Sequence, residues 1–175
     1  MISTARRATA PVLVYVDDTE DDIVLMEMTI LRAALPFRLR QFATITAAVA
    51  YLKGEGSFSN RSLHPLPFAV LLDYRLTGVT AAEALPELLR IPECRGLPFV
   101  IFSGSESPAV IALGYRAGAS HFLLKPNSPG RLEVLLKTLY DCATAHPPCY
   151  LAIRALPEYQ ARKPEAEGSS VSSGR

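Results

Sequence analysis

The stretch Phe68-Ala-Val-Leu-Leu-Asp73-Tyr-Arg-Leu-Thr-Gly78 is an apolar run that ends at one carboxylate and then enters a polar loop containing glycine. Strands covered on both faces of a parallel sheet read as continuous Val/Leu runs, so this run predicts a buried parallel strand. Open α/β sheets bind ligands in the crevice outside the carboxyl ends of their strands. Asp73 is therefore predicted to lie where chemistry is done.

Three further apolar segments end in polar residues in the same way. Residues 12–16 run into Asp17-Asp18, residues 99–102 into Ser103-Gly104, and residues 122–124 into Lys125-Pro126. Because the carboxyl ends of parallel strands meet at one edge of a sheet, these polar ends are predicted to form one constellation.

Helical patterns separate these strands. We expect helices after Thr19, over 46–53, around 81–89, from Ser107-Pro108 to Gly118, and from Ser128-Pro129 to about 142, with a further short strand at 37–42. Five strands alternating with five helices predict an α/β fold with a doubly wound, five-stranded parallel sheet. The first helix is expected to present an apolar face made of Val24, Leu25, Met28, Leu31 and Leu35, and the last helix to pair Glu133 with Lys137.

Length and composition indicate one globular domain. The chain has 175 residues, of which 49% are hydrophobic and 20% charged. We expect a flexible N-terminus over 1–10, a domain over 11–143, and a mostly disordered extension over 144–175 with no output domain. Residues 54–67 are long for a helix-to-strand connection, and are predicted to lie at the amino ends of the strands, away from the acidic cluster.

Charge and cysteine content exclude several classes of protein. The formal net charge of +1 and the scattered basic residues give no reason to expect nucleic acid or a membrane as partner. Cys94, Cys142 and Cys149 show no Cys-x-x-Cys spacing, which indicates free thiols of a reducing compartment. The apolar segment after Arg6-Arg7 is too short for a signal peptide or a membrane span, so a cytoplasmic location is predicted.

An acidic pair, a lone Asp, a hydroxyl and a Lys at successive strand ends resemble the receiver domain of two-component response regulators. The resemblance covers residues 11–143 and implies a flavodoxin-like, three-layer fold. The stretch Tyr51-Leu-Lys-Gly-Glu-Gly and the lack of a second domain are similar to the stand-alone regulators associated with bacterial phytochromes.

The resemblance assigns roles to the acidic residues. Asp73 would accept a phosphoryl group from a phosphohistidine of a kinase. Asp18 would be a direct ligand of Mg²⁺, Asp17 would bind the ion mostly through water, and the main-chain carbonyl of Arg75 would be the third protein ligand. Clustered carboxylates repel one another and need cations nearby, which independently favours a divalent ion.

The remaining roles fall on the other strand ends. Lys125 would neutralise charge on the phosphoryl oxygens, and Ser103 would donate a hydrogen bond to one of them. Phe122 matches the switch aromatic, which would rotate inward when Ser103 moves toward the phosphoryl group. Each residue taken alone has an ordinary explanation as a helix cap, turn hydroxyl, surface lysine or core aromatic. The loop after Asp73 also departs from the usual family pattern, with Thr77 where proline is common.

The resemblance implies a signalling module and not an enzyme, although it would assist its own phosphorylation and dephosphorylation. Its partners would be a sensor histidine kinase of phytochrome type and a downstream protein bound to the face formed by residues 108–142, with self-association as another use of that face. A phosphorylation-independent pseudo-receiver is the main alternative. An aspartyl-phosphate-forming phosphatase is disfavoured, because that class needs an Asp two residues after the nucleophile, where this chain has Arg75.

Overall fold

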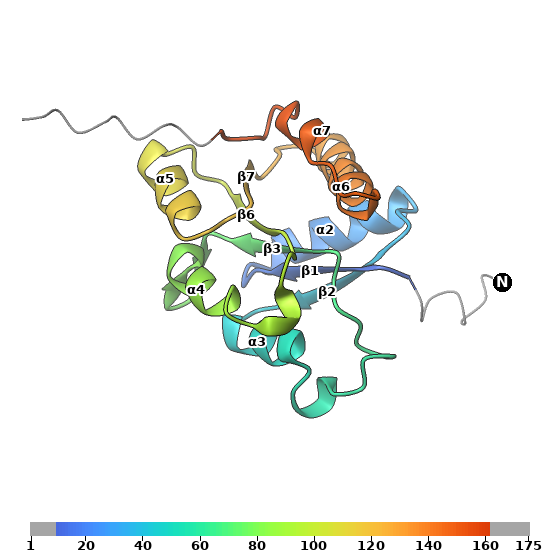
Figure 1. The fold of residues 1–175 in the computed structure, drawn as a ribbon. Helices are drawn as coiled ribbons and strands as arrows, with labels where there is room; N and C mark the ends of the chain where they lie inside the picture. Colours follow the sequence, from blue (N-terminus) through green and yellow to red (C-terminus); the bar gives the residue numbers. More distant parts are fainter. Residues whose placement is uncertain (1–9, 162–175) are drawn as a thin grey trace, which may run out of the picture.

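The computed structural model describes residues 10–161 and has a central parallel sheet between two layers of helices (Figure 1). The five strands lie in the order β2-β1-β3-β6-β7. Their bounds are β1 Val12–Val16, β2 Arg38–Phe42, β3 Ala69–Asp73, β6 Phe99–Ser103 and β7 His121–Leu124. The predicted doubly wound, five-stranded parallel sheet is confirmed.

Helices cover the two faces of the sheet and make two cores. One core contains α3 (Ile45–Lys53), α4 (Ala81–Leu88) and α5 (Pro108–Arg116), and the other contains α2 (Glu20–Arg32), α6 (Pro129–Thr144) and α7 (Leu151–Arg154). Along β1, Val14 faces the first core and Tyr15 the second. This alternation follows from the two-residue period of a strand, and it explains why every residue of β1 is buried.

Two short helical turns and a hairpin complete the described elements. The turns are η1 (Gly56–Phe58) and η2 (Pro92–Cys94), and the hairpin pairs β4 (Arg75–Leu76) with β5 (Val79–Thr80). The polar residues after the apolar run predict a loop here and not a hairpin. The hairpin forms because Gly78 takes a positive φ of 81° at the turn, a conformation that glycine adopts without steric cost.

The face of α2 that packs against the sheet differs from the expected one. Val24, Met28 and Leu31 are 50%, 47% and 70% exposed, whereas Met26 and Thr29 are buried. The helix carries apolar residues on more than one stripe, so its period alone does not select the inward stripe. Packing against the sheet and α6 makes that selection.

In α6, the predicted buried face is confirmed, but the predicted ion pair on its exposed face is wrong. The four leucines of α6 are buried, as expected. Lys137, however, binds Asp141 at 2.8 Å and not Glu133. Carboxylates stand four residues away on both sides of Lys137, so spacing alone allows either pair.

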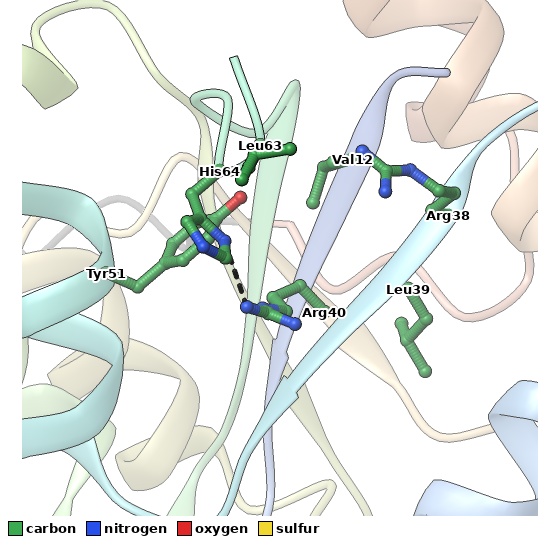
Figure 2. Close-up of a pocket in the computed structure, with 7 residues that line it drawn as sticks. All are labelled: Val12, Arg38, Leu39, Arg40, Tyr51, Leu63 and His64. Carbon is green, nitrogen blue, oxygen red and sulfur yellow. Dashed lines mark hydrogen bonds between the residues drawn. The ribbon is translucent and has the colours of Figure 1, made fainter. Parts of the chain in front are cut away.

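Residues 54–67 lie at the amino ends of the strands, as predicted. They close a pocket of about 90 Å³ with Val12 and the side chains of β2. Figure 2 shows the guanidinium of Arg40 reaching the ring of His64, with 3.1 Å between Nη2 and Nδ1. Arg61 donates hydrogen bonds to the carbonyl oxygens of Tyr51 (2.8 Å) and Leu52 (2.5 Å), so the connection also satisfies the C-terminal end of α3.

The ordered body continues beyond residue 143. Residues 145–161 turn back and pack on α6 and β7, and Ile153 of α7 is fully buried in the second core. The expectation of disorder after residue 143 therefore does not hold for residues 145–161, because apolar side chains anchor this segment. The expectations for residues 1–9 and for the tail over 162–175 lie outside the described residues.

Two further predictions concern the cysteine thiols and membrane-spanning helices. Cys94, Cys142 and Cys149 are free thiols, as predicted. Over residues 10–161, none of the helices combines the length and apolar character that a bilayer crossing requires.

Candidate functional site

The register of the sheet brings the predicted residues to one edge. Val16 of β1 lies beside Leu72 of β3, so the residues that follow them, Asp17 and Asp73, are neighbours. Asp73 in turn lies beside Phe102 of β6. The N–H of Lys125 donates to the carbonyl oxygen of Ser103 at 2.8 Å, which places Lys125 at the same edge.

The ammonium of Lys125 is the centre of the site. Its Nζ lies 2.6 Å from Asp17 Oδ2, 2.6 Å from Asp73 Oδ1 and 2.7 Å from Asp22 Oδ2. The side chain of Asp73 is 13% exposed and that of Asp17 is fully buried. Asp73 therefore combines a tightly held carboxylate with access from solvent.

Burial and these ion pairs act in opposite directions on the two central groups. Burial raises the pKa of Asp73, and the hydrogen bond from Lys125 opposes that rise. Burial alone would lower the pKa of Lys125, but hydrogen bonds to Asp17, Asp22 and Asp73 raise it above its usual range. The lysine is therefore a permanent cation in this site.

Asp17 is held by groups from its own strand and loop. The hydroxyl of Tyr15 donates to Asp17 Oδ2, and the N–H of Thr19 donates to Asp17 Oδ1 at 2.8 Å. Burial and the bond to Asp17 raise the pKa of Tyr15. Donors thus meet both oxygens of this buried carboxylate, as a charge without access to water requires.

Asp18 points toward the loop that follows Asp73. Its Oδ2 accepts hydrogen bonds from the N–H of Thr77 at 2.7 Å and from the hydroxyl of Thr77 at 2.5 Å. The bond from the hydroxyl lowers the pKa of Asp18. Thr77 therefore fastens the loop that follows β3 to the loop that follows β1.

Arg75 contributes through its main chain. Its N–H donates to Asp73 Oδ2 at 2.5 Å, while its side chain is exposed. As the first residue of β4, Arg75 lies opposite Thr80 in the hairpin. The hairpin thus fixes the backbone next to the carboxylate of Asp73.

Ser103 is buried beside this cluster, and its hydroxyl accepts a hydrogen bond from the N–H of Ser105 at 3.1 Å. Phe122 is fully buried. A Cβ added to Gly114 of α5 would lie 3.2 Å from the Phe122 ring and 2.6 Å from Ile101 Cδ1, so the absence of a side chain at Gly114 makes room for both. The ring of Phe122 thus lies inside the core in this structure, and its rotation on phosphorylation stays a prediction.

Sequence reasoning did not include three contributors to this site. A carboxylate in the first turn of a helix, such as Asp22, is ordinarily explained by its attraction to the helix N-terminus, yet Asp22 holds Lys125. Tyr15 reads as an ordinary core residue of a buried strand, and Thr77 as a departure from a family pattern. The signal that could have found Asp22 is its position one helical turn after Asp18, on the first turn above the sheet edge.

The donor chemistry of the site suits a hard divalent cation. Four carboxylates, those of Asp17, Asp18, Asp22 and Asp73, surround one ammonium, which leaves a formal excess of negative charge. Carboxylate oxygens are the ligands that Mg²⁺ prefers. Within residues 10–161, no group of three or more His, Cys, Asp or Glu side chains is arranged to hold a metal ion. Lys125 lies among three of the carboxylates.

Comparison with known proteins gives one related sequence and many related folds. No family model matches the chain. Response regulator Rcp1 of Synechocystis is 25% identical over 114 residues, which span 65% of this chain and 76% of Rcp1. The crystal structure of the Mn²⁺-bound form of Rcp1 superposes with a TM-score of 0.62 at 22% identity, covering 75% of this chain and 92% of that one.

Two further crystal structures share the fold. A response regulator in red light signaling of R. palustris has a TM-score of 0.68 at 24% identity, covering 75% of this chain and 92% of that one. The phosphorylated cyanobacterial phytochrome response regulator RcpA has a TM-score of 0.67 at 22% identity, covering 79% of this chain and 96% of that one. This chain therefore has the receiver fold and resembles the stand-alone, phytochrome-associated response regulators.

Proposed function

We propose that this protein is a single-domain response regulator that accepts a phosphoryl group on Asp73 from a histidine kinase. The observation that carries the proposal is the contact between a partly exposed Asp73 and the ammonium of Lys125, at 2.6 Å, on the carboxyl edge of a receiver sheet. The similarity to Rcp1 and to the red-light and phytochrome regulators supports a kinase of phytochrome type as the partner.

The residues of this site would divide the chemistry as follows. Asp73 Oδ attacks the phosphorus atom, the bond from phosphorus to the donor breaks, and the donor leaves with the bonding electron pair. Lys125 neutralises charge on the transferred oxygens, and the Ser103 hydroxyl donates a hydrogen bond to one of them. The N–H of Arg75 keeps the other oxygen of Asp73 in place during the attack.

A divalent ion, with Mg²⁺ as the proposed species, would be held by Asp17, Asp18, Asp73 and the main chain of Arg75. When bound, it supplies positive charge beside the transferred group. The Mn²⁺-bound form of Rcp1 supports a divalent ion in this class of protein. Burial raises the pKa of Asp73, and a cation bound beside it would oppose that rise and keep the carboxylate ionised for the attack.

Intact-mass measurement after incubation with a small phosphodonor and Mg²⁺ tests the proposal. We expect the wild type to gain the mass of one phosphoryl group and Asp73→Asn to gain none. Asp21→Asn, which removes a charge from an exposed position of α2, is the matched control and should be phosphorylated like the wild type. An unmodified wild type would favour the phosphorylation-independent pseudo-receiver instead.

A further inference from the structure

The free edge of the sheet at β7 is paired with the chain's own C-terminal segment. β7 is the last strand in the sheet order. The N–H of Leu124 donates to the carbonyl oxygen of Glu158 at 2.8 Å, and the N–H of Gln160 donates to that of Phe122 at 2.9 Å. Leu123 lies opposite Tyr159 in an antiparallel bridge. Residues 157–160, called here the edge segment, therefore lie on β7 as a short added strand.

Side chains of the domain hold this segment at three points. Arg131 Nε of α6 lies 2.8 Å from Oε1 of Glu158, a carboxylate that is 4% exposed. The hydroxyl of Tyr115 of α5 donates to the carbonyl oxygen of Gln160 at 2.6 Å and accepts the N–H of Phe122 at 3.2 Å. The ring of His121 faces that of Tyr159, with 6.2 Å between centroids.

These contacts describe a binding site with a defined ligand chemistry. The β7 backbone pairs with an extended chain, Arg131 selects an acidic side chain, and His121 meets an aromatic ring at the next position. Strand addition to a free edge is a common mode of peptide recognition, in which the main chain supplies affinity and side-chain contacts supply specificity. The edge segment has the matching sequence Pro157-Glu158-Tyr159-Gln160.

We propose that the β7 edge, with Arg131 and Tyr115 beside it, is the partner-binding surface of this protein. It takes an extended peptide in which an acidic residue precedes an aromatic one. The edge segment occupies this surface as an intramolecular ligand that a partner must displace. This inference rests on the proposed function, since it identifies the output surface of the same signalling module.

The edge segment is also joined to the acceptor site. Leu124, which donates to Glu158, directly precedes Lys125, whose ammonium binds Asp73. A pocket of about 240 Å³ lies between the edge segment and the acceptor site. Its lining includes Gly104, Lys125, Arg131 and Glu158. A change in the contacts of Lys125 on phosphorylation of Asp73 would therefore act at the end of the strand that holds the edge segment.

An intramolecular ligand sets the affinity that a partner must exceed. A tethered segment acts at a high effective concentration, about millimolar for a short flexible linker. Two main-chain bonds, the bond from the Tyr115 hydroxyl, the ion pair of Arg131 with Glu158 and the ring contact of His121 hold the edge segment. A free peptide that makes these contacts and adds others can replace it. The wild type is therefore expected to bind an isolated copy of the segment weakly, and a variant with a loosened segment to bind it more tightly.

Peptide binding to the full chain tests the proposal. The probe is a fluorescent peptide, Ala-Leu-Pro-Glu-Tyr-Gln-Ala, which copies residues 155–161, with anisotropy as the readout. Gln160→Pro removes the N–H that bonds Phe122, while the matched control Gln160→Ala keeps it. We expect the Pro variant to bind the peptide at least tenfold more tightly than the wild type or the Ala variant. Exchange of the Leu124 amide proton should be faster in the Pro variant alone.

A second variant covers the case in which Gln160→Pro does not fold. Glu158→Gln weakens the edge segment by removing its charge, leaves the groove untouched, and should also raise the affinity for the peptide. A peptide with Lys in place of Glu should not bind any variant.

Equal peptide affinity in the Pro and Ala variants, or equal binding of the Lys peptide, would overturn the inference. Dimers of Gln160→Pro in sedimentation would overturn the partner assignment, because the occupant of the edge would then be a second copy of the chain. The assay uses no phosphorylation, so its failure leaves the acceptor role of Asp73 standing.

Discussion

At the scale of single residues, the site depends on how one lysine is shared among carboxylates. Lys125 contacts Asp22 as well as Asp17 and Asp73. The Asp22 side chain is 35% exposed, so its ion pair is worth less than one in the protein interior. Asp22 nevertheless competes for the ammonium and adds negative charge where a phosphoryl group would arrive.

Replacement of Asp22 should therefore speed acceptance of a phosphoryl group. We expect Asp22→Asn to release Lys125 toward Asp73 and to reduce repulsion of the donor. An exposed pair is worth about 0.5–1 kcal/mol, which corresponds to a rate about two to five times higher. The initial rate of the mass change with a small phosphodonor measures this. Asp21→Asn removes the same charge one residue away, and equal rates for the two variants would rule out a specific role for Asp22.

Thr77 binds the carboxylate of Asp18 through its N–H and its hydroxyl. Its hydroxyl lowers the pKa of Asp18, so Thr77→Val should bring that pKa back toward its ordinary value, whereas Thr77→Ser should keep it low. Because the pKa of Asp18 is depressed in the folded state, the stability from this contact is present above the pKa of the unfolded chain. It is lost as the pH falls through the folded pKa. An NMR titration of the Asp18 carboxyl carbon checks the shift, and an unchanged pKa in Thr77→Val would contradict it.

At the scale of elements, α5, β7 and the edge segment are joined by the hydroxyl of Tyr115. This hydroxyl accepts a hydrogen bond from the N–H of Phe122 and donates one to the carbonyl oxygen of Gln160. These two main-chain groups do not bond each other directly. Burial raises the pKa of Tyr115, so the hydroxyl stays protonated and keeps its donor role.

Tyr115→Phe should leave both main-chain groups without this partner. An unpaired buried polar group costs about 1–3 kcal/mol, and we expect a loss of free energy of unfolding in that range, measured by urea denaturation. Tyr140→Phe is the control, because Tyr140 packs its ring on Phe37 and Phe68. Its effect should stay within about 0.5 kcal/mol. Equal losses in the two variants would show that the bridge contributes nothing.

At the scale of the whole molecule, acidification should loosen the C-terminal part of the fold. His121 is buried against the rings of Tyr150 and Tyr159, and its Nδ1 has no hydrogen-bond partner among the described residues. Burial, and to a lesser degree the charge of Arg154, lowers its pKa. The unfolded chain takes up a proton at pH of about 6.5 and the folded chain only at lower pH, so folding favours the neutral ring.

The stability that depends on neutral His121 is therefore complete above pH of about 6.5 and declines as the pH falls below it. We expect amide exchange at Leu124 and Gln160, corrected for the intrinsic pH dependence, to rise on acidification. His121→Phe should remove most of this dependence, because a phenyl ring fills similar space without titrating. A pH dependence unchanged in that variant would assign the effect to other groups.

Periodicity and composition were sufficient for the sheet and for the grouping of its polar ends. Short apolar runs bounded by polar loops and alternating with helical patterns favour strands buried on both faces, and the carboxyl ends of such strands meet at one edge. The predicted residues Asp17, Asp73 and Lys125 lie in contact through Lys125 for this reason. Local patterns were insufficient where two solutions have equal spacing, as for the inward stripe of α2 and the partner of Lys137.

The sequence by itself determined the layered α/β fold, the order of its elements and the chemistry at the sheet edge, because these depend on residue type and period. Only the tertiary structure decided which carboxylates hold Lys125, that Thr77 holds Asp18, and that residues 157–160 close the β7 edge. Those contacts join positions far apart in the chain: Asp17 and Lys125 are separated by 108 residues, and Asp18 and Thr77 by 59. Packing of the whole chain selects such pairs, and no local pattern encodes them.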